Sequence, residues 1–325
     1  VMNRSLLCRP FCAALGLSAV LFAACSSDDT SELTDAGQTD DSGVADSGTE
    51  DGGVSMPPNE VALGGDRPAR MRVPATYDGS AFPLVILLHG YTSNSAQQDA
   101  YFGLSNLVDS RSFFLILPDG TREQTPLQNR FWNATDACCD FTDTNVDDVG
   151  YLLGLVDEAS AQYNIDPNRV MAVGHSNGGF MAYRLACDAS TRIAAVASLA
   201  GATFDDEADC SATSPVSVLQ VHGTQDTTIR YDGGNILGVT YPSAEETVEQ
   251  WATRAGCSTT ATPGDAKDLD RGIDGNDTDT FVYADGCDEG IEVQLWRING
   301  GGHVPPLTND FAEGVVDFLL SHPKP

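Results

Sequence analysis

Continuous apolar runs of the length of buried β-strands recur along the chain. Two early runs, at residues 83–88 and 113–117, each stop at a polar turn. Similar runs cover residues 170–173, 193–199 and 216–221. Because these runs lack polar alternation, they are typical of strands that are buried on both faces in a parallel sheet.

Helical patterns separate these strands. Asp147 or Asp148 suits a helix start, and apolar positions then recur up to Asn164. Strands that alternate with helices predict a three-layer α/β fold with a mostly parallel central sheet. The remaining predicted elements are edge strands in 60–73, helices at 180–187, 245–255 and 311–321, late strands at 280–283 and 291–298, and a long irregular segment at 121–145.

The first 58 residues differ in composition from the rest. Arg4 and Arg9 precede the apolar run 11–24, which is too short to span a bilayer and predicts a secretory signal. The sequence Leu-Phe-Ala-Ala-Cys that ends at Cys25 resembles a bacterial lipobox, although Phe22 stands where Leu is usual. This resemblance implies a lipid-anchored protein of the cell envelope, with ordinary cleavage and extracellular release as the alternative.

An acidic segment follows this signal. Residues 26–58 contain nine Asp and Glu and no Lys or Arg, so they cannot bury enough apolar surface to fold. We therefore expect a signal at 1–25, a disordered tether at 26–58 and one domain at 59–325.

The chain is strongly acidic, with 17 Lys and Arg against 47 Asp and Glu and a net charge of −30. Such a field repels nucleic acid and anionic polysaccharide and favours a neutral or cationic substrate. We expect no nucleic-acid partner and a monomer.

Six cysteines fall within the predicted domain. An even number in an exported chain indicates disulfides. The adjacent pair Cys138 and Cys139 either forms a vicinal bridge or stays reduced. We predict that the others pair as Cys187 with Cys210 and Cys257 with Cys287.

The sequence Gly174-His175-Ser176-Asn177-Gly178 matches G-x-S-x-G between a predicted strand and a predicted helix. This is the context of a nucleophile elbow, a strained turn that exposes a serine. The alternative is a glycine-rich turn that matches by chance. We take Ser176 as the candidate nucleophile.

A serine nucleophile needs a histidine base, and the chain has five histidines. His175 adjoins the serine and is expected to point away from it, while His89 and His222 suit roles in supporting turns. His322 lies near the end of the last helix. His303 remains, in a glycine-rich loop after the last strand, and is the candidate base.

The acid of such a triad lies between the serine and the histidine in this chain order. Asp226 follows the strand at 216–221, at the carboxyl end where α/β sheets place their sites. Asp232 is a weaker candidate. We therefore predict a triad of Ser176, Asp226 and His303.

Such chemistry also needs an oxyanion hole and an acyl pocket. The backbone N–H groups of Asn177 and Tyr91 are the expected oxyanion donors. The expected reaction is acyl transfer through a Ser176 ester, with water as the final acceptor. Trp132 and Tyr91 are candidates for lining the acyl pocket, with a core position as the alternative for each.

The ordered motifs L-L-H-G-Y, L-P-D-G-T, F-W-N, C-C, D-P-N-R-V, G-H-S-N-G-G, V-H-G-T-x-D and G-G-G-H resemble one family. It comprises short polyhydroxybutyrate depolymerases, feruloyl esterases and acetyl xylan esterases of carbohydrate esterase family 1. The resemblance runs from about Gly64 to His322 and implies an α/β-hydrolase fold and the same triad. Family members often read G-G-G-H-x-W-P, whereas Pro305 replaces the tryptophan here.

We expect neither a cofactor nor a metal. No Cys and His spacing matches a zinc site, and the acidic run 265–279 lacks the ligand spacing of an EF-hand loop. A solvated loop is the expected state of that run.

The favoured function is a serine carboxylesterase acting on hydroxyalkanoate esters or on feruloylated or acetylated plant polysaccharide. The alternatives are a non-catalytic surface-binding lipoprotein on a hydrolase scaffold and a serine peptidase of the same fold.

Overall fold

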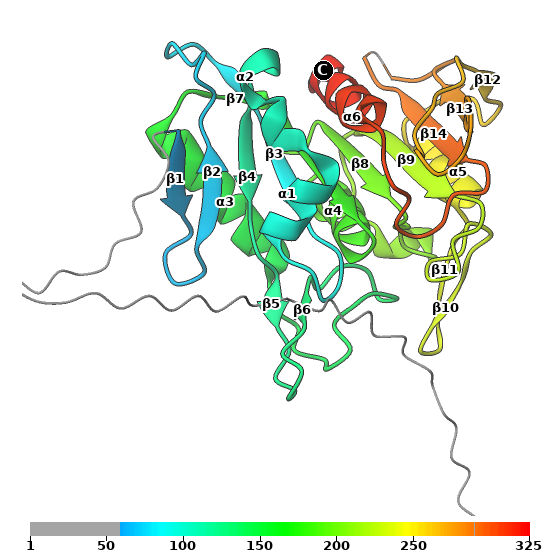
Figure 1. Cartoon of the computed structure of the whole chain (residues 1–325), viewed down its shortest axis with the longest axis horizontal. Coiled ribbons are helices and arrows are strands. Elements are labelled where there is room, and N and C mark those ends of the chain that lie inside the picture. Colours follow the sequence, from blue (N-terminus) through cyan, green and yellow to red (C-terminus); the bar gives the residue numbers. More distant parts are fainter. Residues whose placement is uncertain (1–58, 289) are drawn as a thin grey trace, which may run out of the picture. The chain divides into compact units, whose positions relative to one another are not determined.

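The structure, a computed structural model, describes residues 59–288 and 290–325. The expected signal, Cys25 and tether lie outside them. Within these ranges ten strands form one sheet (Figure 1). In spatial order they are β1 (Glu60–Leu63), β2 (Ala69–Arg72), β4 (Phe114–Leu117), β3 (Phe82–Leu88), β7 (Ile165–His175), β8 (Ala195–Leu199), β9 (Ser217–Gly223), β14 (Val293–Ile298), β13 (Thr278–Tyr283) and β12 (Thr262–Pro263).

The centre of the sheet is parallel and its edges are antiparallel. Neighbouring strands from β4 to β14 all pair in parallel. The outer strands β1, β2, β13 and β12 pair antiparallel. The predicted mostly parallel sheet is therefore confirmed, and the apolar runs form its centre.

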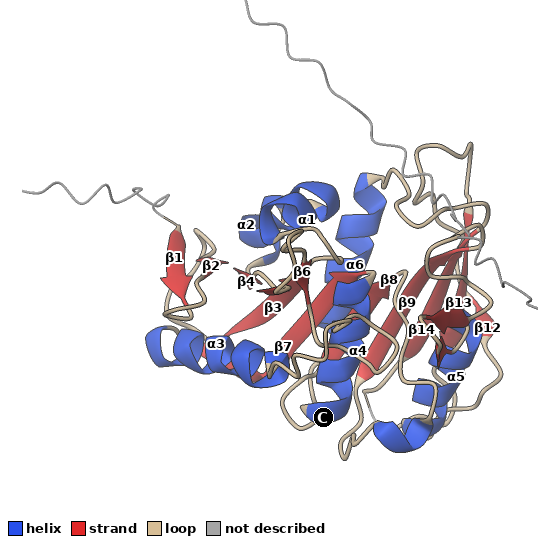
Figure 2. Ribbon diagram, turned by 90° about the horizontal axis from the view of Figure 1, so that it is seen from below, coloured by secondary structure: helices blue, strands red, loops and turns tan. Residues whose placement is uncertain are grey.

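Helices cover both faces of the sheet (Figure 2). Alternate side chains of β3 separate two cores, because Leu84 and Ile86 pack into one apolar cluster while Val85 and Leu87 pack into the other. The cluster with Leu84 includes residues of α3 (Asp148–Gln162), α4 (Asn177–Asp188) and α5 (Ala244–Arg254). The cluster with Val85 includes residues of α1 (Ser95–Phe102), α2 (Val108–Arg111) and α6 (Asn309–Ser321).

No helix in the described ranges is long and apolar enough to cross a membrane.

Helix starts follow local capping chemistry. The side chain of Asp147 accepts the N–H of Gly150 at the start of α3, as the sequence pattern predicts. A capping box between Ser243 and Glu246 begins α5, one residue before its predicted start.

Two short hairpins were not predicted from the sequence. The first, β5 (Thr121–Arg122) with β6 (Arg130–Phe131), lies in the segment expected to be irregular. The second pairs β10 (Gly234–Ile236) with β11 (Val239–Tyr241). They follow the carboxyl ends of β4 and β9, so both insertions border the edge of the sheet where α/β folds place their sites (Figure 1). Two 3-10 helices, η1 (Leu104–Asn106) and η2 (Glu207–Asp209), complete the described elements.

The structure joins the cysteines in three disulfides. Cys187 pairs with Cys210 and Cys257 pairs with Cys287, as predicted. The adjacent Cys138 and Cys139 are also joined, which selects the vicinal bridge over the reduced pair.

Removing the Cys187–Cys210 disulfide should destabilise the domain. The bridge closes a loop with a sequence separation of 23 residues. A loop of that size restricts the unfolded chain by about 3 kcal/mol. The double variant Cys187→Ala with Cys210→Ala should lose that much free energy of unfolding, measured by urea denaturation. A loss below about 1 kcal/mol would contradict this assignment.

Candidate active site

Ser176 lies on a tight turn between β7 and α4. Its backbone has φ 53° and ψ −120°, a left-handed conformation that is strained for a residue with a side chain. A side chain at Gly178 would place its Cβ 2.2 Å from the carbonyl oxygen of Leu88. A Cβ at Gly174 would lie equally close, 2.2 Å, to the carbonyl of Gly178. The two glycines of the motif therefore permit the close packing that a nucleophile elbow requires.

The three residues predicted as a triad lie together. Nε2 of His303 is 3.0 Å from Oγ of Ser176, and its Nδ1 is 2.7 Å from Oδ2 of Asp226. They follow the carboxyl ends of β7, β9 and β14, which lie near one another in the parallel part of the sheet. When Nδ1–H donates to Asp226, Nε2 is free to accept the hydroxyl proton of Ser176.

The carboxylate of Asp226 is held in place on both oxygens. Its Oδ1 accepts the N–H groups of Thr228 at 2.8 Å and Ile229 at 3.0 Å. Burial opposes the ionised form, but hydrogen bonds from His222 and His303 outweigh it and keep the pKa of Asp226 well below its usual range. Asp226 is therefore an anion that can orient the imidazole of His303 and stabilise its protonated form.

His175 supports the backbone of His303. Its Nε2–H donates to the carbonyl oxygen of His303 at 2.8 Å, and the two ring centroids lie 4.9 Å apart. Burial, reinforced by the nearby His303, lowers the pKa of His175 to about 4. No sequence pattern indicates this role, because nothing near His175 in the chain predicts that its ring lies against a loop 128 residues further along.

His89 organises the loop that follows β3. Its Nε2 accepts the N–H of Gly120 at 2.8 Å, which leaves Nδ1–H to donate to the carbonyl of Gly90 at 2.8 Å. The N–H of the same trans peptide belongs to Tyr91 and points the opposite way. Burial lowers the pKa of His89 to about 4, so this pattern holds at neutral pH.

The two expected oxyanion donors lie beside the serine. Asn177 is the first residue of α4, where N–H groups have no acceptor within the helix. Tyr91 and Ser176 line the same cavity, and a Cβ on Gly90 would come within 3.5 Å of Cβ of Ser176. The arrangement is compatible with both amides facing an oxygen bound at Ser176, as we expect from the sequence.

This cavity has a volume of about 420 Å³. Tyr91 lines it, but Trp132 does not: the Trp132 side chain is fully buried. The expectation that Trp132 lines an acyl pocket is therefore wrong, and its alternative, a core position, holds. The other lining residues that carry side chains are Ser93, Gln97, Gln98, Tyr101, His175, Ser176, His303 and Val304.

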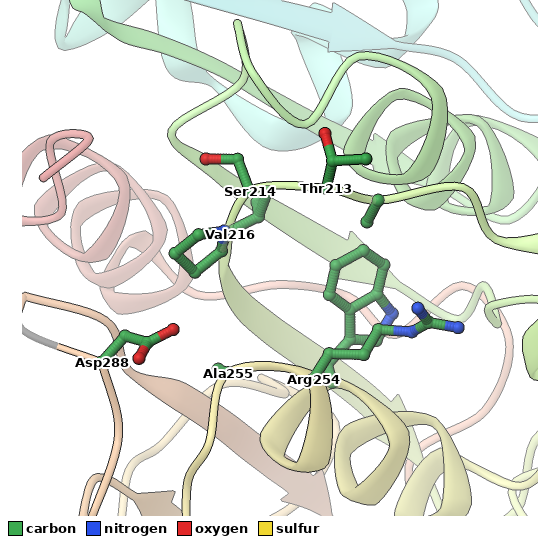
Figure 3. Close-up of a pocket in the computed structure, with 9 residues that line it drawn as sticks. Thr213, Ser214, Val216, Arg254, Ala255 and Asp288 are labelled. Atoms are coloured by element: carbon green, nitrogen blue, oxygen red, sulfur yellow. The ribbon is translucent and has the colours of Figure 1, made fainter.

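A second hollow, of about 200 Å³, lies at the amino-terminal end of β9 (Figure 3). Its lining includes Ser214, Val216, Arg254 and Asp288, and none of the triad residues. Because Val216 directly precedes β9, this hollow lies at the opposite end of that strand from Asp226.

Within the acidic run 265–279, backbone N–H groups donate hydrogen bonds to carboxylates of the same run. Buried Asp277 accepts the N–H groups of Leu269 at 3.2 Å and Asp270 at 2.9 Å. Asp270 in turn accepts the N–H of Gly272 at 2.8 Å. In the described ranges no group of three or more His, Cys, Asp or Glu could hold a metal ion.

The free energy of unfolding should decrease at acidic pH because of the two buried histidines, His89 and His175. Burial lowers the pKa values of His89 and His175 to about 4, while an unfolded histidine titrates near 6.5. Between these values the unfolded chain binds protons that the folded chain does not, so the free energy of unfolding decreases as pH falls. The decrease approaches about 1.4 kcal/mol per pH unit for each histidine.

His175→Gln offers a direct check, because the amide keeps a donor for the carbonyl of His303 but does not titrate. Urea unfolding from pH 7 to pH 4 should give a shallower pH dependence for His175→Gln than for the wild type. Equal slopes would contradict the neutral, buried state of His175.

Comparison with known proteins places the chain in a family. Residues 70–245 match the family described as esterase PHB depolymerase. Feruloyl esterase B of Piromyces equi is 28% identical over 245 residues, which cover 72% of this chain and 42% of that protein. Feruloyl esterase D of Neurospora crassa is 26% identical over 254 residues, covering 74% of this chain and 75% of that protein. The chain thus spans less than half the length of the first of these relatives.

A solved structure shares the fold. The acetyl xylan esterase from Aspergillus awamori superposes with a TM-score of 0.57 at 17% identity, over 80% of this chain and 98% of that protein. This likeness shows an α/β-hydrolase fold. Because the family match covers more than half of the sequence, the chain belongs to the esterase PHB depolymerase family.

Proposed function

We propose that this protein is a serine carboxylesterase in which Ser176, His303 and Asp226 form the catalytic triad. The observation that carries the proposal is the continuous hydrogen-bonded path from Oγ of Ser176 through His303 to Asp226, at 3.0 and 2.7 Å. Family membership and the named esterase relatives support the same reaction class.

The first half of the reaction acylates the serine. The hydroxyl of Ser176 gives its proton to Nε2 of His303 as Oγ attacks the ester carbonyl. The N–H groups of Tyr91 and Asn177 stabilise the negative oxygen that develops on the carbonyl. His303 then returns the proton to the leaving alcohol, while ionised Asp226 stabilises the imidazolium during the transfer.

The second half releases the acid. Water gives a proton to Nε2 of His303 and attacks the Ser176 ester, and the same two amides bind the oxyanion. The proton returns to Oγ as the acid leaves, which restores the starting hydrogen bonds. No redox step or cofactor enters this cycle.

The cavity indicates an uncharged acyl group. Its lining includes the rings of Tyr91 and Tyr101 and the aliphatic Val304, and it contains no Lys or Arg. We propose esters of hydroxyalkanoate oligomers or polymers, or of feruloylated or acetylated plant polysaccharide, as substrates. The relatives include feruloyl esterases and a bifunctional acetylxylan esterase/xylanase, which supports the polysaccharide esters.

Export and membrane attachment belong to the same proposal. The Cys187–Cys210 and Cys257–Cys287 disulfides favour an oxidising compartment. We propose that residues 1–25 direct export, that Cys25 is lipidated, that 26–58 tether the domain at 59–325, and that the enzyme acts as a monomer.

Replacing the nucleophile should abolish turnover. We expect Ser176→Ala to lower kcat/KM for p-nitrophenyl butyrate by about 10⁴-fold or more, and Asp226→Asn to lower it by a similar order. Ser110→Ala, on the exposed surface of α2, is the matched control and should retain wild-type activity. A fluorophosphonate probe should fail to label Ser176→Ala and should still label Ser110→Ala.

A substrate panel separates the competing functions. The protein should hydrolyse hydroxybutyrate oligomers, methyl ferulate and acetylated xylan, and the relative rates rank these three classes of ester as substrates. It should not cleave a peptide p-nitroanilide. Preferred cleavage of the peptide would establish the peptidase alternative. Absence of both turnover and probe labelling in the wild type would establish the non-catalytic alternative.

A further inference from the structure

Trp132 forms hydrogen bonds with both segments that carry the expected oxyanion donors. One donor, the N–H of Asn177, begins α4, and the other, the N–H of Tyr91, lies in the loop after β3. Two amides from separate segments stabilise one oxygen only when their relative position is fixed to a fraction of an ångström. A residue bonded to both segments is suited to fix that position.

The contact with Asn177 has two points. The backbone N–H of Trp132 donates to Oδ1 of Asn177 at 2.7 Å, and Nδ2 of Asn177 donates to the carbonyl of Trp132 at 2.9 Å. Both polar atoms of the carboxamide are thereby used, so the side chain of Asn177 anchors the start of α4. Its backbone N–H is left for the oxyanion.

The contact with the other segment uses the indole. Nε1–H of Trp132 donates to the carbonyl of His89 at 3.0 Å, and the two ring centroids lie 5.2 Å apart. His89 also holds the carbonyl of Gly90, whose peptide carries the N–H of Tyr91. The indole bond is therefore one peptide group away from the second donor.

The surroundings of Trp132 hold it rigidly. Its side chain has no exposed surface, and the guanidinium of Arg67 lies 5.3 Å from the ring centroid. The next residue, Asn133, donates its backbone N–H to the buried carboxylate of Asp148 at 2.7 Å. Asp148 is also paired with Arg67 at 2.6 Å, so the peptide that follows Trp132 is tied to the start of α3.

We propose that Trp132 is a positioning residue that holds the Asn177 and Tyr91 amides in register for oxyanion binding. This inference rests on the proposed esterase function. From the sequence, Trp132 was expected to contact the substrate. In the proposed role it lies beneath the site and acts on the transition state through Asn177 and His89.

The test compares two buried tryptophans. Trp132→Phe removes the indole donor and keeps an aromatic ring. Trp251→Phe is the matched control, because buried Trp251 donates its indole N–H to Oγ1 of Thr203 at 3.2 Å, on α5 and outside the triad cavity. For p-nitrophenyl butyrate, Trp132→Phe should lower kcat about 10- to 100-fold with KM changed less than about threefold, and Trp251→Phe should leave both near wild type.

Butylboronic acid supplies a readout that a merely structural role would not move. Its tetrahedral adduct with Ser176 places an oxygen in the oxyanion hole, so its inhibition constant should rise in Trp132→Phe by a factor similar to the loss of kcat. Asn177→Ala keeps the backbone N–H and removes both bonds to Trp132, so it should weaken boronate binding in the same way. This second variant tests the inference if Trp132→Phe does not fold.

Each outcome decides the question. Equal kcat and boronate inhibition in folded Trp132→Phe and Trp251→Phe would overturn the positioning role and leave the esterase proposal intact. If only Asn177→Ala folds, wild-type boronate affinity in that variant would overturn it. A wild-type protein that neither hydrolyses the ester nor binds the boronate would overturn both proposals.

Discussion

The close approach of the α4 start to the end of β3 is the constraint on which the site depends. A Cβ at Gly178 would lie 2.2 Å from the carbonyl oxygen of Leu88, so no larger residue fits without moving a strand or a helix. This contact brings the strained turn at Ser176 against the loop after β3. The nucleophile and both expected oxyanion donors are consequently set by the packing of two buried elements.

Burial keeps two of the histidines near the site neutral. His89 and His175 are kept neutral by the cost of burying a charge, and each uses its ring to hold a backbone carbonyl. Nδ1 of His222 accepts from Gln220, while its Nε2–H donates to the carbonyl of Ile229 and also lies 3.4 Å from Oδ2 of Asp226. His303 alone among the described histidines joins a carboxylate and the hydroxyl of Ser176. The neutral rings of His89 and His175 therefore shape the site, while His303 is placed to exchange the proton.

The sequence was sufficient to predict the parallel centre of the sheet and the grouping of Ser176, Asp226 and His303. Apolar runs mark buried strands, and the position after each strand is enough to bring these residues to one edge. It was not sufficient for Trp132 or His175. Trp132 lies in an aperiodic segment, and in its buried position it is hydrogen-bonded to Asn177, 45 residues further along. Whether an aromatic ring faces a cavity or packs beneath it is decided by such distant contacts, which no local pattern encodes.

Around the loop after His303, other residues line the cavity near the position where members of the family often have a tryptophan. Pro305 occupies that position and is buried, and the hydroxyl of Tyr101 on α1 donates to its carbonyl at 2.9 Å. Tyr101 lines the cavity, so a ring from α1 supplies an aromatic surface beside Val304. On the other side, the hydroxyl of Tyr91 is already bonded to Glu123 and accepts from Asn129, which leaves its ring as its contribution to the cavity. These walls offer two rings and an aliphatic side chain, so the surface that they present to the cavity is largely apolar.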